Sequence, residues 1–315
     1  MEKLKVGIIG AGRIGQVHAK SITYHIPQAE IVAISDIFVE GAKKVSEELG
    51  IPNYYEDYHE ILNNPEITAV LICSSTDTHA DIAIEAAKAG KHIFCEKPLA
   101  VSEEEGLAIE EEVEKHPECI FMLGFMRRYD PSYAYAKKKI KEGAIGKPYL
   151  VKATGIDPDA AAEQLLSSGF IPDSGGIMLD MGSHDIDLMR WFLEDEVSSI
   201  YAVGSVVKYP EFAKQGDMET ACATFTFRGG GIGQFHVGRI SCHGYHIETE
   251  IIGTEGSIRI SPVPEKNLAM IYNHTGAVKE CVGSFPERFA VAYAEEMKEF
   301  IKCVQEGRKP DIDVH

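Results

Sequence analysis

The stretch Val6-Gly7-Ile8-Ile9-Gly10-Ala11-Gly12-Arg13-Ile14-Gly15 decides the fold, because it places three spaced glycines directly after a short apolar run. Between a strand and a helix this spacing is typical of a phosphate-binding turn: Gly10 permits the tight turn, Gly12 lets the backbone approach a pyrophosphate, and Gly15 allows close helix–strand packing. Taken alone, three glycines among 29 are weak evidence, and an ordinary turn is about as likely. The interpretation as a cofactor turn places the dinucleotide over residues 10–15, with Arg13 and Ile14 beside the glycines.

The region around this turn alternates short apolar runs with amphipathic stretches. The apolar runs lie at 4–9, 31–35, 69–73, 92–95 and 120–123, and helical patterns such as 39–49 and 80–89 lie between them. This rhythm indicates βαβ units and a parallel sheet with helices on both faces. Because the glycine turn opens the series, we expect a dinucleotide-binding Rossmann domain over residues 1–123.

The pattern changes from about residue 145, where longer strand-like segments follow one another at 149–155, 200–207, 221–227, 231–240, 247–252 and 257–260. Glycine-rich turns separate several of them, and helical patterns lie near 131–142, 184–193 and 287–305. A chain of 315 residues also exceeds the size at which single cores usually stop growing. We therefore expect a second α/β domain over residues 124–315, with a large, mostly antiparallel open sheet.

Composition limits the partners of the chain. Its formal net charge of −18 argues against nucleic acid and against an anionic membrane surface, since both need clustered Lys and Arg. The same charge does not exclude an anionic cofactor, because backbone amides at a helix N-terminus can hold phosphate. The start of the chain does not resemble a signal peptide, and the seven cysteines form no Cys-x-x-Cys pair, so we expect a cytoplasmic protein with free thiols.

Asp36 stands at the end of the second apolar run. An acidic residue there can accept hydrogen bonds from the adenosine ribose hydroxyls and repels the extra phosphate of NADP, so the sequence favours NAD. The alternative is that Asp36 caps the helix that follows, and both roles can coexist.

Lys97 follows the buried run His92-Ile93-Phe94-Cys95-Glu96 and precedes Pro98. In an open parallel sheet, ligands bind beyond the carboxyl ends of the strands, which is where Lys97 would emerge. The alternative is that Glu96 and Lys97 form a solvated strand end, which is the more frequent fate of such a pair.

The segment 175–187 is the most informative part of the second half. Asp180 and His184 share a face if this segment is helical, and a carboxylate beside an imidazole suits a base that removes a hydroxyl proton. Asp187 could support the ring. The alternatives are a capping Asp180 with a packed His184, or a metal site. No third soft ligand stands at conventional spacing, so we expect no metal.

Taken in order, these motifs resemble those of the Gfo/Idh/MocA oxidoreductases over nearly the whole chain. The stretches that carry the resemblance are Gly10-Ala11-Gly12-Arg13-Ile14-Gly15 with His18, Ser74-Ser75-Thr76-Asp77-Thr78-His79, Glu96-Lys97-Pro98 and Asp180-Met181-Gly182-Ser183-His184-Asp185. Within the family the chain is most similar to the inositol 2-dehydrogenase branch, in Gly124-Phe125-Met126-Arg127-Arg128-Tyr129-Asp130-Pro131, Asp157-Pro158 and Ser174-Gly175-Gly176-Ile177-Met178-Leu179-Asp180-Met181. It departs from that branch at Ile156, where a basic residue is common.

The resemblance implies a catalytic triad of Lys97, Asp180 and His184. His184 would accept the hydroxyl proton, and Lys97, held as a cation by Asp180, would stabilise the developing alkoxide. The resemblance also implies further cofactor contacts, from Ser74, Thr76, His79, Glu96 and Lys97. Substrate contacts are implied for the triad and for Arg127, Asp157, Asp187 and Tyr293. It further implies a homodimer or homotetramer that is joined through the C-terminal sheet.

The expected reaction is the NAD-dependent oxidation of a secondary hydroxyl of a cyclic polyol or sugar, similar to myo-inositol, to a ketone. Ile156 should disfavour phosphorylated or acidic substrates. Two alternatives are an NAD-dependent glycoside hydrolase of the same fold and a non-catalytic dinucleotide sensor. Sensors of this kind usually lack the lysine or the histidine, and this chain keeps both.

Overall fold

The computed structural model of this chain describes residues 3–169, 171, 174–260, 265–274 and 276–315. The chain divides into two compact units, of which the first consists of Met1–Tyr129 and Val291–His315 and the second of Asp130–Ala290. The expected boundary lay between residues 123 and 124, whereas the two units meet between residues 129 and 130. In addition, the C-terminal segment 291–315 returns to the first unit. Its apolar side chains Met297, Phe300 and Ile301 are buried in a core of that unit, and this burial holds the segment there.

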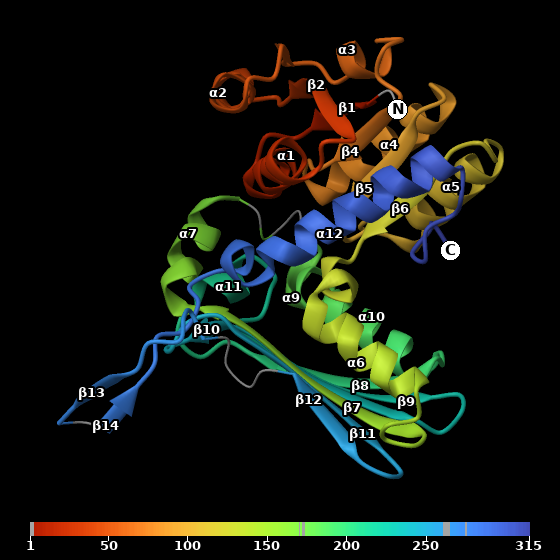
Figure 1. Cartoon of the computed structure of the whole chain (residues 1–315). Coiled ribbons are helices and arrows are strands. Elements are labelled where there is room, and N and C mark those ends of the chain that lie inside the picture. Colours follow the sequence, from red (N-terminus) through yellow and green to blue (C-terminus); the bar gives the residue numbers. More distant parts are fainter. Residues whose placement is uncertain (1–2, 170, 172–173, 261–264, 275) are drawn as a thin grey trace. The chain divides into compact units, whose positions relative to one another are not determined.

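The first unit is built on a parallel sheet of six strands in the order β3-β2-β1-β4-β5-β6 (Figure 1). The strands are β1 (Leu4–Ile9), β2 (Ala29–Ser35), β3 (Asn53–Tyr55), β4 (Ala69–Ile72), β5 (His92–Glu96) and β6 (Phe121–Gly124). The helical elements are α1 (Arg13–His25), α2 (Val39–Leu49), α3 (His59–Leu62), η1 (Thr76–Thr78), α4 (His79–Lys88), α5 (Glu103–Glu114), η2 (Met126–Tyr129) and most of α12 (Phe285–Glu306). This architecture confirms the predicted Rossmann fold.

Apolar side chains of the central strands enter cores on both faces of this sheet. Val6 and Ile8 of β1 belong to a core with residues of α1, α2 and α12, whereas Ile9 belongs to a core with residues of α3, α4 and α5. Because successive strand residues point to opposite faces, a sheet that is covered on both sides requires unbroken apolar runs. The five short apolar runs of the sequence therefore form β1, β2, β4, β5 and β6.

The second unit contains a mixed sheet of six strands in the order β12-β11-β7-β10-β9-β8. Its strands are β7 (Pro148–Pro158), β8 (Val197–Ser205), β9 (Thr220–Phe227), β10 (Ile232–Ser241), β11 (His246–Gly253) and β12 (Ser257–Ile260). Its helical elements are α6 (Pro131–Lys141), η3 (Asp159–Ala161), α7 (Ala162–Ser167), α9 (Gly176–Asp180), α10 (Gly182–Leu193) and α11 (Glu211–Lys214). Only β7 and β10 pair in parallel, so the predicted, mostly antiparallel sheet is confirmed.

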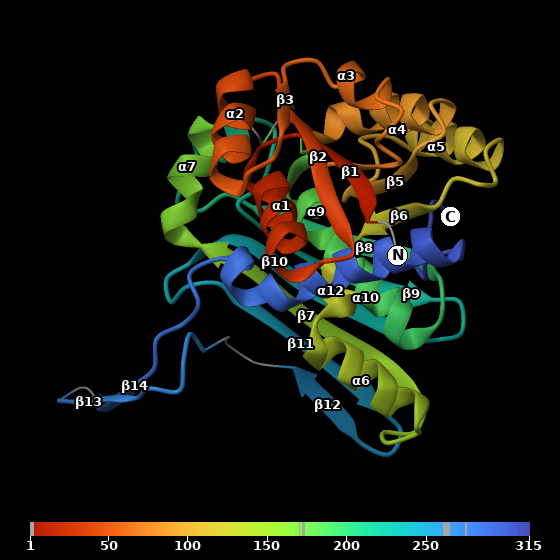
Figure 2. The ribbon, with the colours of Figure 1, turned by 45° about the horizontal axis from the view of Figure 1, so that its top comes forward.

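This second sheet is covered on one face. In β9 and β11 more buried and more exposed residues alternate, as one-sided packing requires. Helix α10 contacts β7 and β10, and α6 contacts β12, on the same face (Figures 1 and 2). The edge strand β8 exposes Ile200, Tyr201 and Val203.

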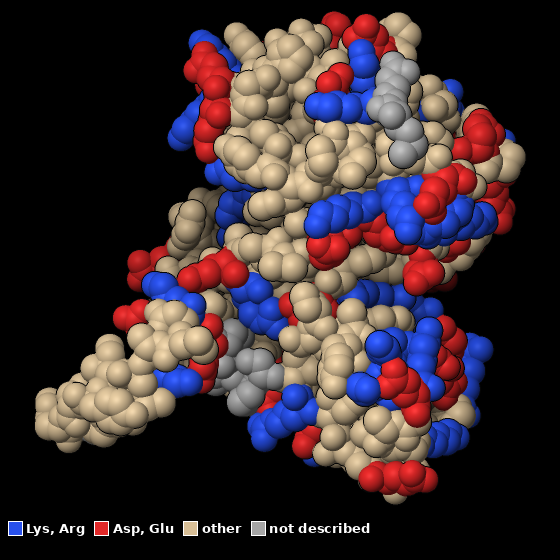
Figure 3. Space-filling model, viewed as in Figure 1, with Lys and Arg blue, Asp and Glu red and all other residues tan. Residues whose placement is uncertain are grey.

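A hairpin of β13 (Ile271–Asn273) and β14 (Gly276–Val278) also belongs to the second unit. It and the residues before it expose several large apolar side chains: Leu268, Met270, Ile271, Tyr272 and Val278. Figure 3 shows a mostly uncharged surface over this hairpin.

Within the described ranges, no helix is both long and apolar enough to cross a membrane.

Candidate active site

The glycine turn joins β1 to α1 where the strand order of the first sheet reverses. Gly10 has a φ of 104°, and a Cβ there would lie 2.5 Å from the main chain of Cys73. A Cβ on Gly15 would overlap the Gly10 carbonyl oxygen, whereas one on Gly12 would meet no described atom within 4 Å. The fold therefore requires Gly10 and Gly15, and Gly12 leaves open space. Helix α1 begins at Arg13 without an acidic residue in its first turn, so its N-terminal end suits a pyrophosphate.

Asp36 connects the end of β2 to the glycine turn. Its carboxylate accepts hydrogen bonds from the Ala11 N–H at 2.7 Å and from the Phe38 N–H at 2.8 Å. Each carboxylate oxygen has a further lone pair, so Asp36 can also accept from ribose hydroxyls. Asp36 thus holds the glycine turn in place, and its contact with the ribose stays a prediction.

Ser74, Thr76 and His79 lie after β4 and do not share one environment. Ser74 Oγ is 2.7 Å from Thr78 Oγ1, and Thr76 is buried in η1. His79 is 1% exposed, and its ring nitrogens lie 2.8 Å from the Pro98 carbonyl oxygen and 3.2 Å from that of Ser74. Burial lowers the pKa of His79, which favours the neutral ring. A neutral ring has one N–H, so His79 donates to one of these two carbonyl oxygens, and its ring is enclosed by protein.

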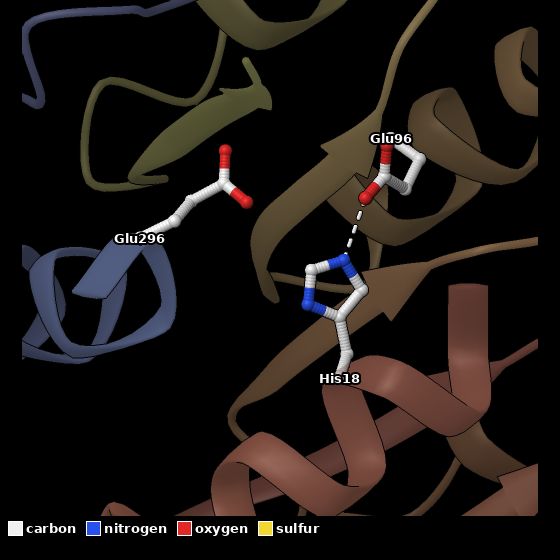
Figure 4. A group of neighbouring side chains, drawn as sticks. All are labelled: His18, Glu96 and Glu296. Carbon is white, nitrogen blue, oxygen red and sulfur yellow. Dashed lines mark hydrogen bonds and ion pairs between the residues drawn. The ribbon is translucent and has the colours of Figure 1, made fainter. Parts of the chain in front are cut away.

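Glu96 ends β5 and Lys97 follows it, with a cis peptide bond between Lys97 and Pro98. The Glu96 side chain is buried and turns inward toward His18, and a dashed line in Figure 4 marks this contact. Its Oε1 lies 2.6 Å from Nε2 of His18, and its Oε2 accepts the Lys97 N–H at 3.2 Å. The two charged side chains at the end of this strand therefore have different surroundings. Glu96 is buried and contacts the main chain of Lys97, whereas the Lys97 side chain is half-buried.

The Asp180 and His184 segment forms two short helices that meet at Met181. Asp180 ends α9, and His184 lies in the first turn of α10. His184 and Asp187 are 7% and 6% exposed, and Asp180 is half-buried. The segment is therefore nearly continuous helix, which is the condition under which Asp180 and His184 share a face.

Arg239 is a residue that the sequence analysis missed. It lies on β10 with 1% exposure and forms ion pairs with three carboxylates: 3.2 Å to Asp180, 3.6 Å to Asp217 and 4.0 Å to Asp157. Asp217 also accepts the Ile177 N–H at 2.9 Å, which holds the start of α9. Alternate residues of β10 are buried, and Arg239 stands in this series with Phe235, Val237 and Ser241. An arginine at an inward-facing strand position was therefore the sequence signal that could have identified it.

The remaining candidates lie in different units. Asp157, Asp180, His184 and Asp187 belong to the second unit. Lys97, Arg127 and Tyr293 belong to the first, where Arg127 and Tyr293 are each 3% exposed. The Tyr293 ring meets the His18 ring edge-on, with centroids 5.5 Å apart. Within the first unit Tyr293 therefore packs beside His18.

The parallel sheet, its open glycine turn and Asp36 define a dinucleotide-binding protein. Residues 4–125 match the Gfo/Idh/MocA oxidoreductase family with its NAD-binding Rossmann fold, and residues 133–259 match the C-terminal domain of the same family. The chain therefore belongs to the Gfo/Idh/MocA oxidoreductases, as its motifs indicated.

Two curated relatives are similar along nearly the whole chain. The scyllo-inositol 2-dehydrogenase (NAD(+)) of Bacillus subtilis is 38% identical over 99% of this chain and 90% of its own length. The myo-inositol 2-dehydrogenase of Thermotoga maritima is 37% identical over 98% and 90%. Among solved structures, scyllo-inositol dehydrogenase from Lactobacillus casei with bound NAD(H) and scyllo-inositol superposes with a TM-score of 0.94, at 36% identity over 99% of this chain and 92% of that chain.

Proposed function

We propose that this protein is an NAD-dependent dehydrogenase that oxidises a secondary hydroxyl of an inositol or a similar cyclic polyol or sugar to a ketone. The observation that carries the proposal is the similarity, over 99% of the chain, to a structure that contains NAD(H) and scyllo-inositol. The Gly12 space, the N-terminal end of α1 and Asp36 support NAD as the cofactor.

The proposed chemistry divides between the cofactor and the chain. When bound, NAD supplies the acceptor for the hydride that leaves the substrate carbon. His184 accepts the proton of the same hydroxyl group, so the substrate loses one hydride and one proton and becomes a ketone. Lys97 stabilises the developing alkoxide through its positive charge. Asp180 supplies the negative charge that keeps Lys97 a cation, and Arg239 holds the Asp180 carboxylate through an ion pair.

The charges around Arg239 support a neutral substrate. Arg239 is enclosed by protein and paired with Asp157, Asp180 and Asp217, so it is not available to bind a phosphate. Asp157 and Asp180 instead suit hydrogen bonds from sugar or polyol hydroxyl groups, and they would repel an anion.

A panel assay tests this proposal. Inositol isomers, free sugars, sugar phosphates and small alcohols are incubated with NAD, and NADH absorbance is recorded. We expect net NADH formation to be highest with an inositol or a free pyranose, which would also distinguish a dehydrogenase from a glycoside hydrolase that regenerates its cofactor and from a sensor. Turnover of a sugar phosphate alone would contradict the substrate assignment.

We also propose a homodimer or homotetramer that forms through the second sheet. Its support is the uncovered sheet face together with Ile200, Tyr201 and Val203 exposed on β8. Sedimentation of the purified protein should show a dimer or tetramer, and Tyr201→Lys should shift it toward the monomer. A monomer at micromolar concentration would contradict this assembly.

A reducing, cytoplasmic location is part of the same proposal. All seven cysteines are free, and burial raises the pKa of the Cys73 and Cys95 thiols, which keeps both protonated. Thiol titration of the unfolded protein should find all seven.

A further inference from the structure

Three buried titratable side chains, His18, Glu96 and Glu296, face one another in the first unit (Figure 4). They come from α1, β5 and α12, and their exposures are 0%, 7% and 0%. One nitrogen or oxygen atom of each lies within 4.8 Å of the others. His18 Nε2 and Glu96 Oε1 are only 2.6 Å apart, closer than two ligands of one tetrahedral ion with bonds of about 2 Å. The arrangement thus favours shared protons over a metal ion.

The two carboxyl groups have different partners. Glu96 meets the His18 ring nitrogen at 2.6 Å and accepts the Lys97 N–H at 3.2 Å. Neither oxygen of Glu296 has a hydrogen-bond partner among the residues that the structure describes. A buried carboxylate without hydrogen-bond donors is costly in its charged form. If the two carboxyl groups carry one negative charge between them, that charge therefore belongs on Glu96. Burial, and then the charge of Glu96, raises the pKa of Glu296 well above its ordinary value.

The groups around this cluster are neutral or apolar. Phe94 and Tyr293 contact the His18 ring edge-on, with centroids 5.0 Å and 5.5 Å away. Burial, and then the charge of Glu96, raises the pKa of Cys73. Tyr129 also has a raised pKa, mainly from burial. Both side chains therefore stay neutral, and none of these four groups supplies a positive charge that would stabilise an ionised Glu296.

We propose that His18 and Glu296 are positioning residues for Lys97: Glu296 stays uncharged, His18 donates to Glu96, and the Glu96 carboxylate holds the Lys97 main chain. This inference rests on the proposed function, in which Lys97 stabilises the alkoxide. Two adjacent buried carboxyl groups ionise one at a time, so an ionised Glu296 would compete with Glu96 for the single charge. An uncharged Glu296 leaves the carboxylate on the side of the cluster that faces Lys97.

Infrared difference spectra of the unmodified protein and Glu296→Gln test the protonation directly, without turnover. At neutral pH the unmodified protein should show the carbonyl-stretch band of a protonated carboxylic acid, and Glu296→Gln should remove it. Glu295→Gln is the matched control on the same helix, because the partly exposed Glu295 pairs with Lys298, and it should remove no such band. Absence of the band from the unmodified protein would overturn the proposal.

Steady-state kinetics and NAD binding test the positioning. His18→Leu removes the donor to Glu96, so it should lower kcat about tenfold, while the Kd for NAD stays within about threefold. His18→Gln, whose amide can donate, should recover part of kcat, and it carries the test if His18→Leu does not fold. Equal losses of kcat and NAD binding in both variants would make His18 a packing residue of α1 and overturn the inference. Failure of the proposed function would give a different result from failure of this inference. The unmodified protein would then form no NADH, while its infrared band would remain.

Discussion

The two units assemble their candidate residues in different ways. In the first unit, four of the candidates follow strands of one parallel sheet: Gly10 follows β1, Asp36 follows β2, Ser74 follows β4 and Lys97 follows β5. Because parallel strands end at the same edge, the order of elements along the chain is enough to gather these residues.

The second unit gathers its charges across longer distances in the sequence. Asp157 lies at the end of a strand, Asp180 at the end of a short helix, Asp217 in a loop and Arg239 within a strand. Only the folded mixed sheet brings the three carboxylates to the arginine. Sites at the ends of parallel strands can therefore be inferred from sequence more readily than a charge cluster on a mixed sheet.

The largest expected effect separates chemistry from cofactor binding. His184→Ala and Lys97→Ala should each lower kcat about 10²–10⁴-fold, because each removes an acid–base or electrostatic group. The Kd for NAD should change little, since the glycine turn and Asp36 are untouched. His243→Ala, at an exposed histidine of the second unit, is the control. Near-normal turnover of His184→Ala across pH would place the base elsewhere.

Arg239 tests whether the second unit depends on its buried charge cluster. Arg239→Met should destabilise the protein by about 3–5 kcal/mol, because it leaves three carboxylates without their shared cation. Urea unfolding measures this loss, and adding Asp217→Asn should recover part of it. Arg228→Met, at an exposed position, should cost less than about 0.5 kcal/mol. A similarly small effect of Arg239→Met would show that the cluster contributes little.

Glu296 tests the buried charge of the first unit through pH. Its pKa is raised in the folded protein, so the folded state keeps a proton that the unfolded state releases above about pH 4.5. Stability should therefore fall as pH rises from that value toward the folded pKa, by up to about 1.4 kcal/mol per pH unit. Glu296→Gln should lose this dependence and gain stability over the unmodified protein as pH rises. Parallel pH curves for both proteins would contradict the raised pKa.

Substitution of Asp36 has the smallest expected effect and tests which cofactor the first unit prefers. Asp36→Ala should narrow the preference for NAD over NADP by about tenfold, or about 1.4 kcal/mol, because it removes the charge that repels the extra phosphate. Binding titrations with both cofactors measure the ratio. Asp77→Ala, on the same edge in η1, is a comparison that should retain the preference. Equal binding of both cofactors by the unmodified protein would contradict the assignment.

The structure adds to the predicted positions the direction in which each side chain turns. The resemblance implied cofactor contacts for Glu96 and His79; both side chains are buried and contact other parts of the protein, and their cofactor contacts stay predictions. Tyr293 was expected at the substrate, and it packs beside His18 in the first unit. A motif identifies the position of a residue along the chain, but the direction of its side chain depends on neighbours that arrive from distant segments.

The sequence by itself determined the Rossmann fold, the glycine turn and the family, because each depends on local periodicity or on short, closely spaced motifs. Tertiary structure alone decided three features: the return of 291–315 to the first unit, the pairing of Arg239 with three aspartates, and the burial of Glu296 beside His18 and Glu96. The physical reason is that burial and charge pairing are long-range properties. A glutamate on an amphipathic helix looks the same in sequence whether water or other buried groups surround it. The register of Arg239 in its strand indicates an inward direction, but only the packed core decides which carboxylates pair with it.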